Sequence, residues 1–96
     1  MKKYKVVIQN PAKEDVRESR SWYNRQQKGL GKRFIVDLRK TLLSIEKNPT
    51  SFAIRYERNR KANLSKFPYG VFFFVDEPFD IVYIIAVKHN ARELAK

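Results

Sequence analysis

The side chains that could take part in chemistry are mostly cations, and they form two groups along the chain. Arg60 and Lys61 lie in the second half of the sequence, and His89 and Arg92 lie near its end. Guanidinium groups bind phosphate through paired hydrogen bonds and stabilise charge in a transition state, and a histidine can transfer a proton near neutral pH. A ribonuclease that uses the 2′-hydroxyl of its RNA needs only a base, an acid and a cation. If the chain is an enzyme, these four residues therefore predict a metal-independent endoribonuclease.

A wider set of cations could instead bind an anionic target without catalysis. These residues are Arg58, Arg60, Lys66, Lys88 and Arg92. In an antiparallel sheet the end of the last strand can lie beside the start of an earlier one, so we expect both groups to meet at one exposed edge of the sheet. The alternative is that lysines at strand edges only prevent edge pairing and that the histidine is an ordinary surface residue.

The charge of the chain indicates what kind of partner it binds. Its 21 Lys and Arg residues exceed its 10 Asp and Glu residues, which gives a formal net charge of +11 at pH 7. Such a surface attracts nucleic acid, the ribosome, an anionic membrane or an acidic protein. The alternative is a charge spread evenly over the surface for solubility.

Several classes of function lack the residues that they need. The chain has no Cys and only one His, so we expect no metal site. It has no phosphate-binding loop, zinc-protease motif or serine elbow, and we expect no cofactor. Its apolar segments fall short of the roughly 20 residues that cross a bilayer. We therefore expect a cytoplasmic protein that does not contact a membrane.

Hydrophobic periodicity predicts one strand and two helices in the first half of the chain. The β-branched and aromatic segment 4–8 is typical of a strand. Asn10 is expected to cap a first helix over about 11–27. Apolar residues then recur every three or four positions, which predicts a second helix that follows Gly29 and ends at Asn48. Because the link between them is short, the two helices should form an antiparallel hairpin.

The second half of the chain has the pattern of a sheet. Four strands are predicted at 52–56, 61–67, 69–75 and 81–87. The last two are unbroken apolar runs, which indicates strands that are buried on both faces and lie centrally. The sequence therefore predicts a single α+β domain over 1–96: an N-terminal strand, a helical hairpin, and a three- to four-stranded antiparallel sheet, in two layers.

Several short motifs occur in this order of elements. They are Trp22-Tyr23-Asn24, Gly29-Leu30-Gly31 followed by Phe34, Ile45-Glu46-Lys47-Asn48-Pro49, Arg60, Phe67-Pro68-Tyr69, and Ala86-Val87-Lys88-His89 with Arg92. Together, over nearly the whole chain, they resemble the RelE/ParE superfamily. The resemblance implies the two-layer fold of that superfamily.

The resemblance also implies a function, the toxin of a type II toxin–antitoxin system that a cognate acidic antitoxin neutralises. ParE-like members, known as plasmid stabilisation proteins, inhibit DNA gyrase, whereas RelE-like members cleave messenger RNA in the ribosome. RelE-like nucleases tend to carry an arginine after the position of Tyr69 and an aromatic residue near the C-terminus, but this chain has Gly70 and ends in Glu93-Leu94-Ala95-Lys96. We therefore favour the ParE-like branch. A RelE-like ribosome-dependent endoribonuclease is the first alternative, and a non-toxic nucleic-acid-binding relative is the second.

Overall fold

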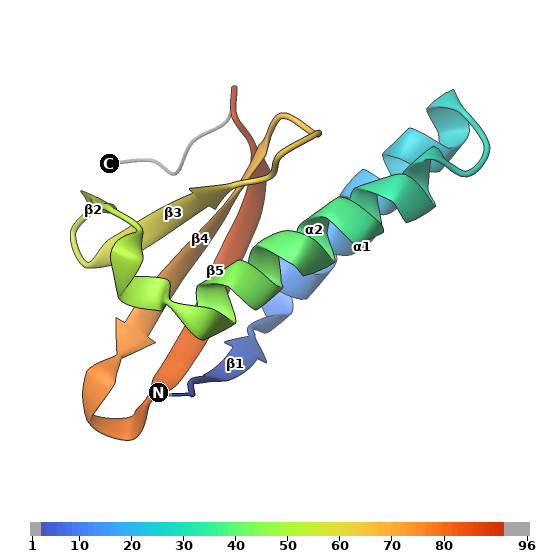
Figure 1. Cartoon of the computed structure of the whole chain (residues 1–96). Coiled ribbons are helices and arrows are strands. Elements are labelled where there is room, and N and C mark those ends of the chain that lie inside the picture. The colour runs from blue at the N-terminus through green and yellow to red at the C-terminus, as the bar shows by residue number, and fades with distance from the viewer. Residues whose placement is uncertain (1–2, 92–96) are drawn as a thin grey trace.

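The computed structural model describes residues 3–91, in which two α-helices cover one face of a five-stranded sheet (Figure 1). The elements are β1 (Lys5–Ile8), α1 (Asn10–Gln26), α2 (Leu30–Lys47), β2 (Ile54–Tyr56), β3 (Asn59–Asn63), β4 (Tyr69–Asp76) and β5 (Ile81–His89). Short 3-10 turns lie at Pro49–Ser51 and Glu77–Phe79. The predicted two-layer α+β architecture is confirmed. Among the described residues, none of the helices is both long and apolar enough to cross a membrane.

The strands lie in the order β1-β5-β4-β3-β2. The pairs from β5 to β2 are antiparallel, as predicted, and the two unbroken apolar strands β4 and β5 lie inside the sheet. β1 pairs with β5 in parallel, with Val6 opposite Val82. The sequence pattern did not predict this partner, because pairing between the two ends of a chain leaves no local signal.

The helical hairpin depends on two glycines with different roles. Gly29 adopts a φ of 86°, in the left-handed region that favours glycine, and so turns the chain between the helices. At Gly31 the helices approach so closely that a Cβ would lie 2.6 Å from the carbonyl oxygen of Arg20. The Gly31 amide also donates a 2.9 Å hydrogen bond to Asn24 Oδ1. Gly31 therefore allows α1 and α2 to pack along their length.

The core lies between the helices and the sheet. Phe34, Leu38 and Ile45 of α2 are buried, as their spacing predicted, and they belong to one cluster with Val71 and Phe73 of β4. Burying apolar side chains of this size contributes about 1.5–3 kcal/mol each. This packing holds the helices against one face of the sheet.

The predicted starts of α1 and β2 are corrected. Asn10 is the first residue of α1 rather than its cap, and the preceding Gln9 makes no side-chain capping hydrogen bond. β2 begins at Ile54, later than predicted, because the turn Pro49–Ser51 follows α2 and takes up the chain before the strand.

A third correction concerns β3, which was predicted over 61–67 and in fact spans Asn59–Asn63. The residues that follow Asn63 leave the strand because they bind a buried carboxylate, that of Asp37 in α2. Its oxygens accept hydrogen bonds from the Ser65 amide (3.3 Å) and hydroxyl (2.9 Å), the Lys66 amide (2.8 Å) and the Phe67 amide (3.1 Å). Burial by itself would raise the pKa of Asp37, but these hydrogen bonds outweigh it and hold the pKa below its ordinary value. The charged carboxylate thus fixes the loop that leads into β4.

Candidate functional site

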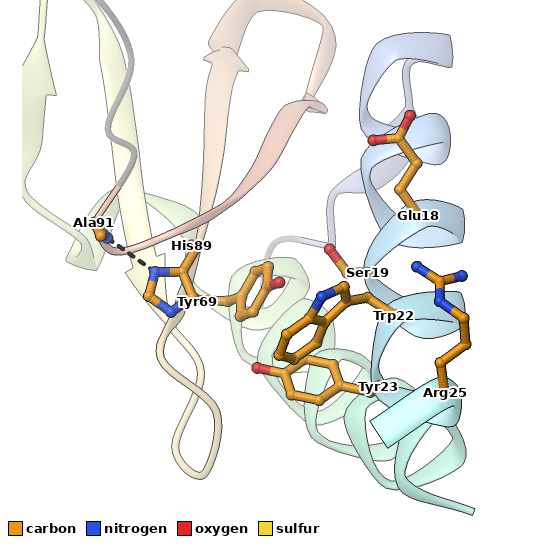
Figure 2. Close-up of a pocket in the computed structure, with 8 residues that line it drawn as sticks. All are labelled: Glu18, Ser19, Trp22, Tyr23, Arg25, Tyr69, His89 and Ala91. Carbon is orange, nitrogen blue, oxygen red and sulfur yellow. Dashed lines mark hydrogen bonds between the residues drawn. The ribbon is translucent and has the colours of Figure 1, made fainter. Parts of the chain in front are cut away.

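An open groove lies between α1 and the ends of β4 and β5 (Figure 2). Its volume is about 670 Å³, which is within the range of ligand-binding pockets. It is lined by Glu18, Ser19, Trp22, Tyr23, Arg25, Tyr69, His89 and Ala91. We call it the aromatic groove because four of these residues present aromatic rings.

The rings of the aromatic groove contact one another, and the Trp22–Tyr23 and Tyr69–His89 pairs do so edge to face. Tyr69 and His89 are cross-strand partners in β4 and β5, with ring centroids 5.3 Å apart. Tyr23 of α1 lies 6.0 Å from Tyr69 and 5.1 Å from Trp22. Trp22 is 49% exposed. Such contacts hold the rings in fixed positions, so the groove is formed before any ligand arrives.

The polar groups of the aromatic groove do not converge on one point. The Nδ1 atom of His89 accepts a 3.1 Å hydrogen bond from the Ala91 amide, so the neutral ring carries its proton on Nε2. Burial raises the pKa of Tyr23, and the neighbouring Tyr69 side chain adds to the rise, so the Tyr23 hydroxyl stays protonated at neutral pH. Figure 2 shows Glu18 and Arg25 on α1, with the aromatic side chains between them and the imidazole. This arrangement suits binding of a partly apolar group better than acid–base catalysis.

The structure separates two of the predicted catalytic residues. Arg60 lies opposite Phe73 and Lys61 lies opposite Phe72 in the pairing of β3 with β4. Successive side chains of a strand point to opposite faces, so Arg60 shares the helix-covered face with buried Phe73, and Lys61 lies on the outer face. Arg60 and Lys61 therefore do not both meet His89 at one edge, and Arg92 lies outside the described residues.

Arg60 contacts the backbone of the chain itself. Its guanidinium donates hydrogen bonds to the carbonyl oxygen of Phe52 (2.6 Å) and to that of Thr50 (3.4 Å). The side chain is half-buried rather than exposed. Arg60 therefore holds the segment between α2 and β2 against the sheet.

His89 lies at one end of the sheet, whereas Arg60 pairs with the middle of β4. Its partner Tyr69 is four residues along β4 from Phe73, the partner of Arg60. This spacing corresponds to about 13 Å along the strand. His89 and Arg60 thus share a face but not a site, and Lys61 is on the other face.

The outer face of the sheet carries cations over aromatic rings. The Lys61 ammonium lies 5.5 Å from the centroid of Phe72, and the Arg58 guanidinium lies 4.8 Å from that of Phe74. Gly70 makes room for this arrangement, since a Cβ there would collide with the Lys61 side chain. Cation–π contacts of this kind hold the charges at defined positions.

The remaining predicted residues lie in three different places. Lys88 forms a 3.1 Å ion pair with Asp15 of α1. The other carboxylate oxygen of Asp15 accepts a hydrogen bond from the Val87 amide at the edge of the sheet. Lys66 lies beside Asp37, in a hollow lined by cations of α2. Arg92 is outside the described residues. Within residues 3–91, no group of three or more His, Asp or Glu side chains is arranged to hold a metal ion.

The aromatic groove was not predicted, although the sequence contains a signal for it. Trp22 lies four residues after Glu18 and three before Arg25, which places a large aromatic residue on the charged face of α1. In the sequence, Trp22 stands out only as part of the Trp22-Tyr23-Asn24 motif. Only the fold brings Tyr69 and His89 to the same groove.

The chain matches, over residues 6–94, the family model described as the ParE toxin of the type II toxin–antitoxin system parDE. It belongs to the ParE toxin family. The expected superfamily and its ParE-like branch are thereby confirmed. No curated protein matches the sequence closely enough to count as a relative.

Solved structures of toxin–antitoxin complexes share the ParE-like fold of this chain. The chromosomal ParDE system of P. aeruginosa aligns with a TM-score of 0.77 and 13% identity, over 90% of this chain and 95% of that one. The E. coli RelBE complex aligns with a TM-score of 0.69 and 19% identity, over 95% and 99%. RelBE2 of Mycobacterium tuberculosis aligns with a TM-score of 0.67 and 17% identity, over 92% and 99%. At these identities the likeness shows the fold, and it does not separate the ParE-like from the RelE-like activity.

Proposed function

We propose that this ParE family member is a toxin that binds and inhibits a cellular protein such as DNA gyrase, and that a cognate acidic antitoxin neutralises it. One observation carries the non-enzymatic part of the proposal. Three of the predicted catalytic residues lie apart: Lys61 is on the outer face, whereas Arg60 and His89 are on the covered face with partners four residues apart along β4. Transfer of a phosphoryl group needs its acid, base and cation around one reacting atom.

The aromatic groove is the proposed anchor for the target protein. Binding energy at protein interfaces is concentrated in a few Trp, Tyr and Arg residues that border pockets, and Trp22, Tyr23 and Arg25 are of these types. Arg58, with Arg92 beyond the described residues, is proposed to assist by attracting an anionic target. Lys88 and Arg60 are not proposed as contacts, because Asp15 pairs with the Lys88 ammonium and backbone carbonyls occupy the Arg60 guanidinium.

Purified toxin tests this proposal in a DNA supercoiling assay with gyrase. Trp22→Ala should weaken inhibition by about thirtyfold, as expected for an interface residue of the most important class. Phe79→Ala is the matched control, because Phe79 is 73% exposed and lies outside the groove. Equal inhibition by the Trp22 variant and the wild type would remove the groove from the proposal.

A second candidate function is the RelE-like cleavage of messenger RNA on the ribosome. The outer face of the sheet favours this candidate, because cations and aromatic rings alternate there as RNA binding requires. Lys61 covers Phe72, and Arg58 covers Phe74. Induced expression separates the candidates. Prompt arrest of translation with RNA cleavage supports the nuclease, and loss of supercoiling with continuing translation supports the gyrase inhibitor. Unchanged growth supports a non-toxic nucleic-acid-binding protein.

A further inference from the structure

The walls of the aromatic groove are flat rings rather than branched aliphatic side chains. Trp22, Tyr23, Tyr69 and His89 supply the rings, and Ala91 is the only aliphatic residue among the described residues that line the groove. Figure 2 shows the four rings gathered between α1 and the ends of β4 and β5. A flat apolar ring packs well against such faces and edges. The walls therefore favour a proline or an aromatic side chain over a leucine or a valine.

The aromatic groove also presents two N–H groups. The indole nitrogen of Trp22 can only donate a hydrogen bond, and His89 keeps its proton on Nε2 because Nδ1 accepts from the Ala91 amide. Within residues 3–91, neither N–H group has an acceptor. A ligand that offers free carbonyl oxygens beside a flat ring would satisfy both groups, and each such hydrogen bond favours binding.

The charge of the lining indicates a neutral ligand. One acid, Glu18, and one cation, Arg25, line the groove in the part of the chain that the structure describes. Other hollows of the same part are surrounded by several cations: Lys13, Arg17 and Arg20 on α1, and Lys32, Arg33, Lys40 and Lys66 beside α2. A nucleic acid would gain more from those hollows, because contacts with phosphates supply much of its binding energy. A cationic segment would be repelled by the net charge of +11.

We infer that the aromatic groove binds an extended, proline-containing segment of the target protein in the polyproline II conformation, and this inference rests on the proposed function. A polyproline II segment has no internal hydrogen bonds, so its carbonyl oxygens are free to accept from Trp22 and His89. Its proline nitrogens carry no hydrogen, so they bring no donor that the rings would leave unsatisfied. Its conformation is largely set before binding, which reduces the entropy that binding costs.

An aromatic side chain carried by a helix of the target is the alternative ligand. It would pack on the rings, but the carbonyl oxygens of a helix are already hydrogen-bonded within the helix. The N–H groups of Trp22 and His89 would then lose water without gaining an acceptor, which is unfavourable. The two donors therefore favour the extended segment.

The test uses the full chain and three probes: hexaproline, a glycine–serine hexapeptide, and a hexamer of thymidine nucleotides. Trp22 is the only Trp of the chain, so its fluorescence reports on the groove. The NMR signals of the Tyr69 and His89 amides report on the wall that the sheet supplies. Hexaproline should change both readouts until they saturate, and it should bind at least about tenfold more tightly than the glycine–serine peptide, which has neither the rings nor the fixed conformation. If the two peptides bind equally, or if only the thymidine hexamer shifts the Tyr69 and His89 signals, the inference is overturned.

Two variants of Trp22 separate the ring from its donor. Trp22→Phe keeps a flat ring but loses the N–H group, and it should bind hexaproline about threefold to tenfold more weakly in an NMR titration. Trp22→Leu loses the ring as well and should bind more weakly still. Phe79→Leu is the matched control, because it replaces an aromatic residue that is 73% exposed and lies outside the groove. The control should bind as the wild type does, and a Trp22→Leu variant that does the same would overturn the inference.

The supercoiling assay separates this inference from the function on which it rests. If the toxin inhibits gyrase, and hexaproline relieves the inhibition while the glycine–serine peptide does not, both are supported. If the toxin inhibits gyrase and hexaproline does not relieve the inhibition, only the inference is overturned. A chain that inhibits neither gyrase nor growth overturns the proposed function and the inference with it.

Discussion

Replacing Asp37 by Asn should destabilise the fold strongly, although the two side chains have the same shape. One carboxylate oxygen accepts the Ser65 amide and hydroxyl, and the other accepts the Lys66 and Phe67 amides. Asparagine can accept through only one oxygen, so its amide group would face a pair of donors. Two hydrogen bonds to a charged group, each contributing about 1.5–3 kcal/mol, are lost. Water can reach part of this loop, and we therefore expect a loss of about 2–4 kcal/mol in the free energy of unfolding.

Urea denaturation at pH 7, followed by the fluorescence of the single Trp, measures this loss. Glu77→Gln is the control for the removal of one negative charge, because Glu77 is exposed and lies in the turn after β4. The control should have the stability of the wild type. An Asp37→Asn variant as stable as the wild type would refute the proposed role of the carboxylate.

The difference in unfolding free energy between the wild type and the Asp37→Asn variant should also depend on pH, which gives a second check. The pKa of Asp37 is lower in the folded chain than in the unfolded chain, where it is about 4. Its contribution is therefore complete above that value and is lost as the pH falls through the lower, folded-state pKa. The wild type should exceed the Asn variant by a constant amount near pH 7, and the gap should shrink below about pH 4. A gap that persists unchanged into strong acid would contradict this explanation.

Three further substitutions test the packing of the fold. Leu38→Ala should lower the free energy of unfolding by about 2–5 kcal/mol, because Leu38 is buried in the core; a negligible change would mean that α2 does not pack as described. Gly31→Ala should lower the melting temperature, at a loss of about 1–3 kcal/mol, since the new methyl group meets the Arg20 carbonyl; an unchanged melting curve would show that the helices can separate freely. Arg60→Ala should lower the free energy of unfolding, measured in urea, by about 1–3 kcal/mol, because the Phe52 and Thr50 carbonyls lose this donor. Arg58→Ala is the matched control and should lower it less. The reverse order would refute the structural role of Arg60.

The local pattern of the sequence was sufficient for most of the elements. The spacing of Phe34, Leu38 and Ile45 predicted the buried side of α2, and Pro49 predicted its end. The apolar runs in β4 and β5 predicted central strands, and these are confirmed. Such signals are local, because the spacing of apolar residues along a helix or strand shows which of its faces is buried.

The boundaries of β3 and the roles of the arginines depended on contacts between distant residues. Asp37 ends β3 through a loop 28 residues further along the chain, and no local pattern records that contact. Arg60 and Lys61 are neighbours in the sequence, but the pleat of β3 directs Arg60 towards the backbone carbonyls of the covered face and Lys61 to the outer face. The two cations therefore do not share one surface.

The charge, the helical hairpin, the central strands and the family resemblance can be inferred from the residues alone, because each of these depends on composition or on short spacings. Which side chains share a surface depends on how the chain folds. Folding brought Trp22 and His89 to one groove, moved Lys61 to the opposite face, and left Val36 and Leu43 outside the core. The physical reason is that a functional surface is assembled from strands and helices that pair at long range, and the register of that pairing is set by the whole core.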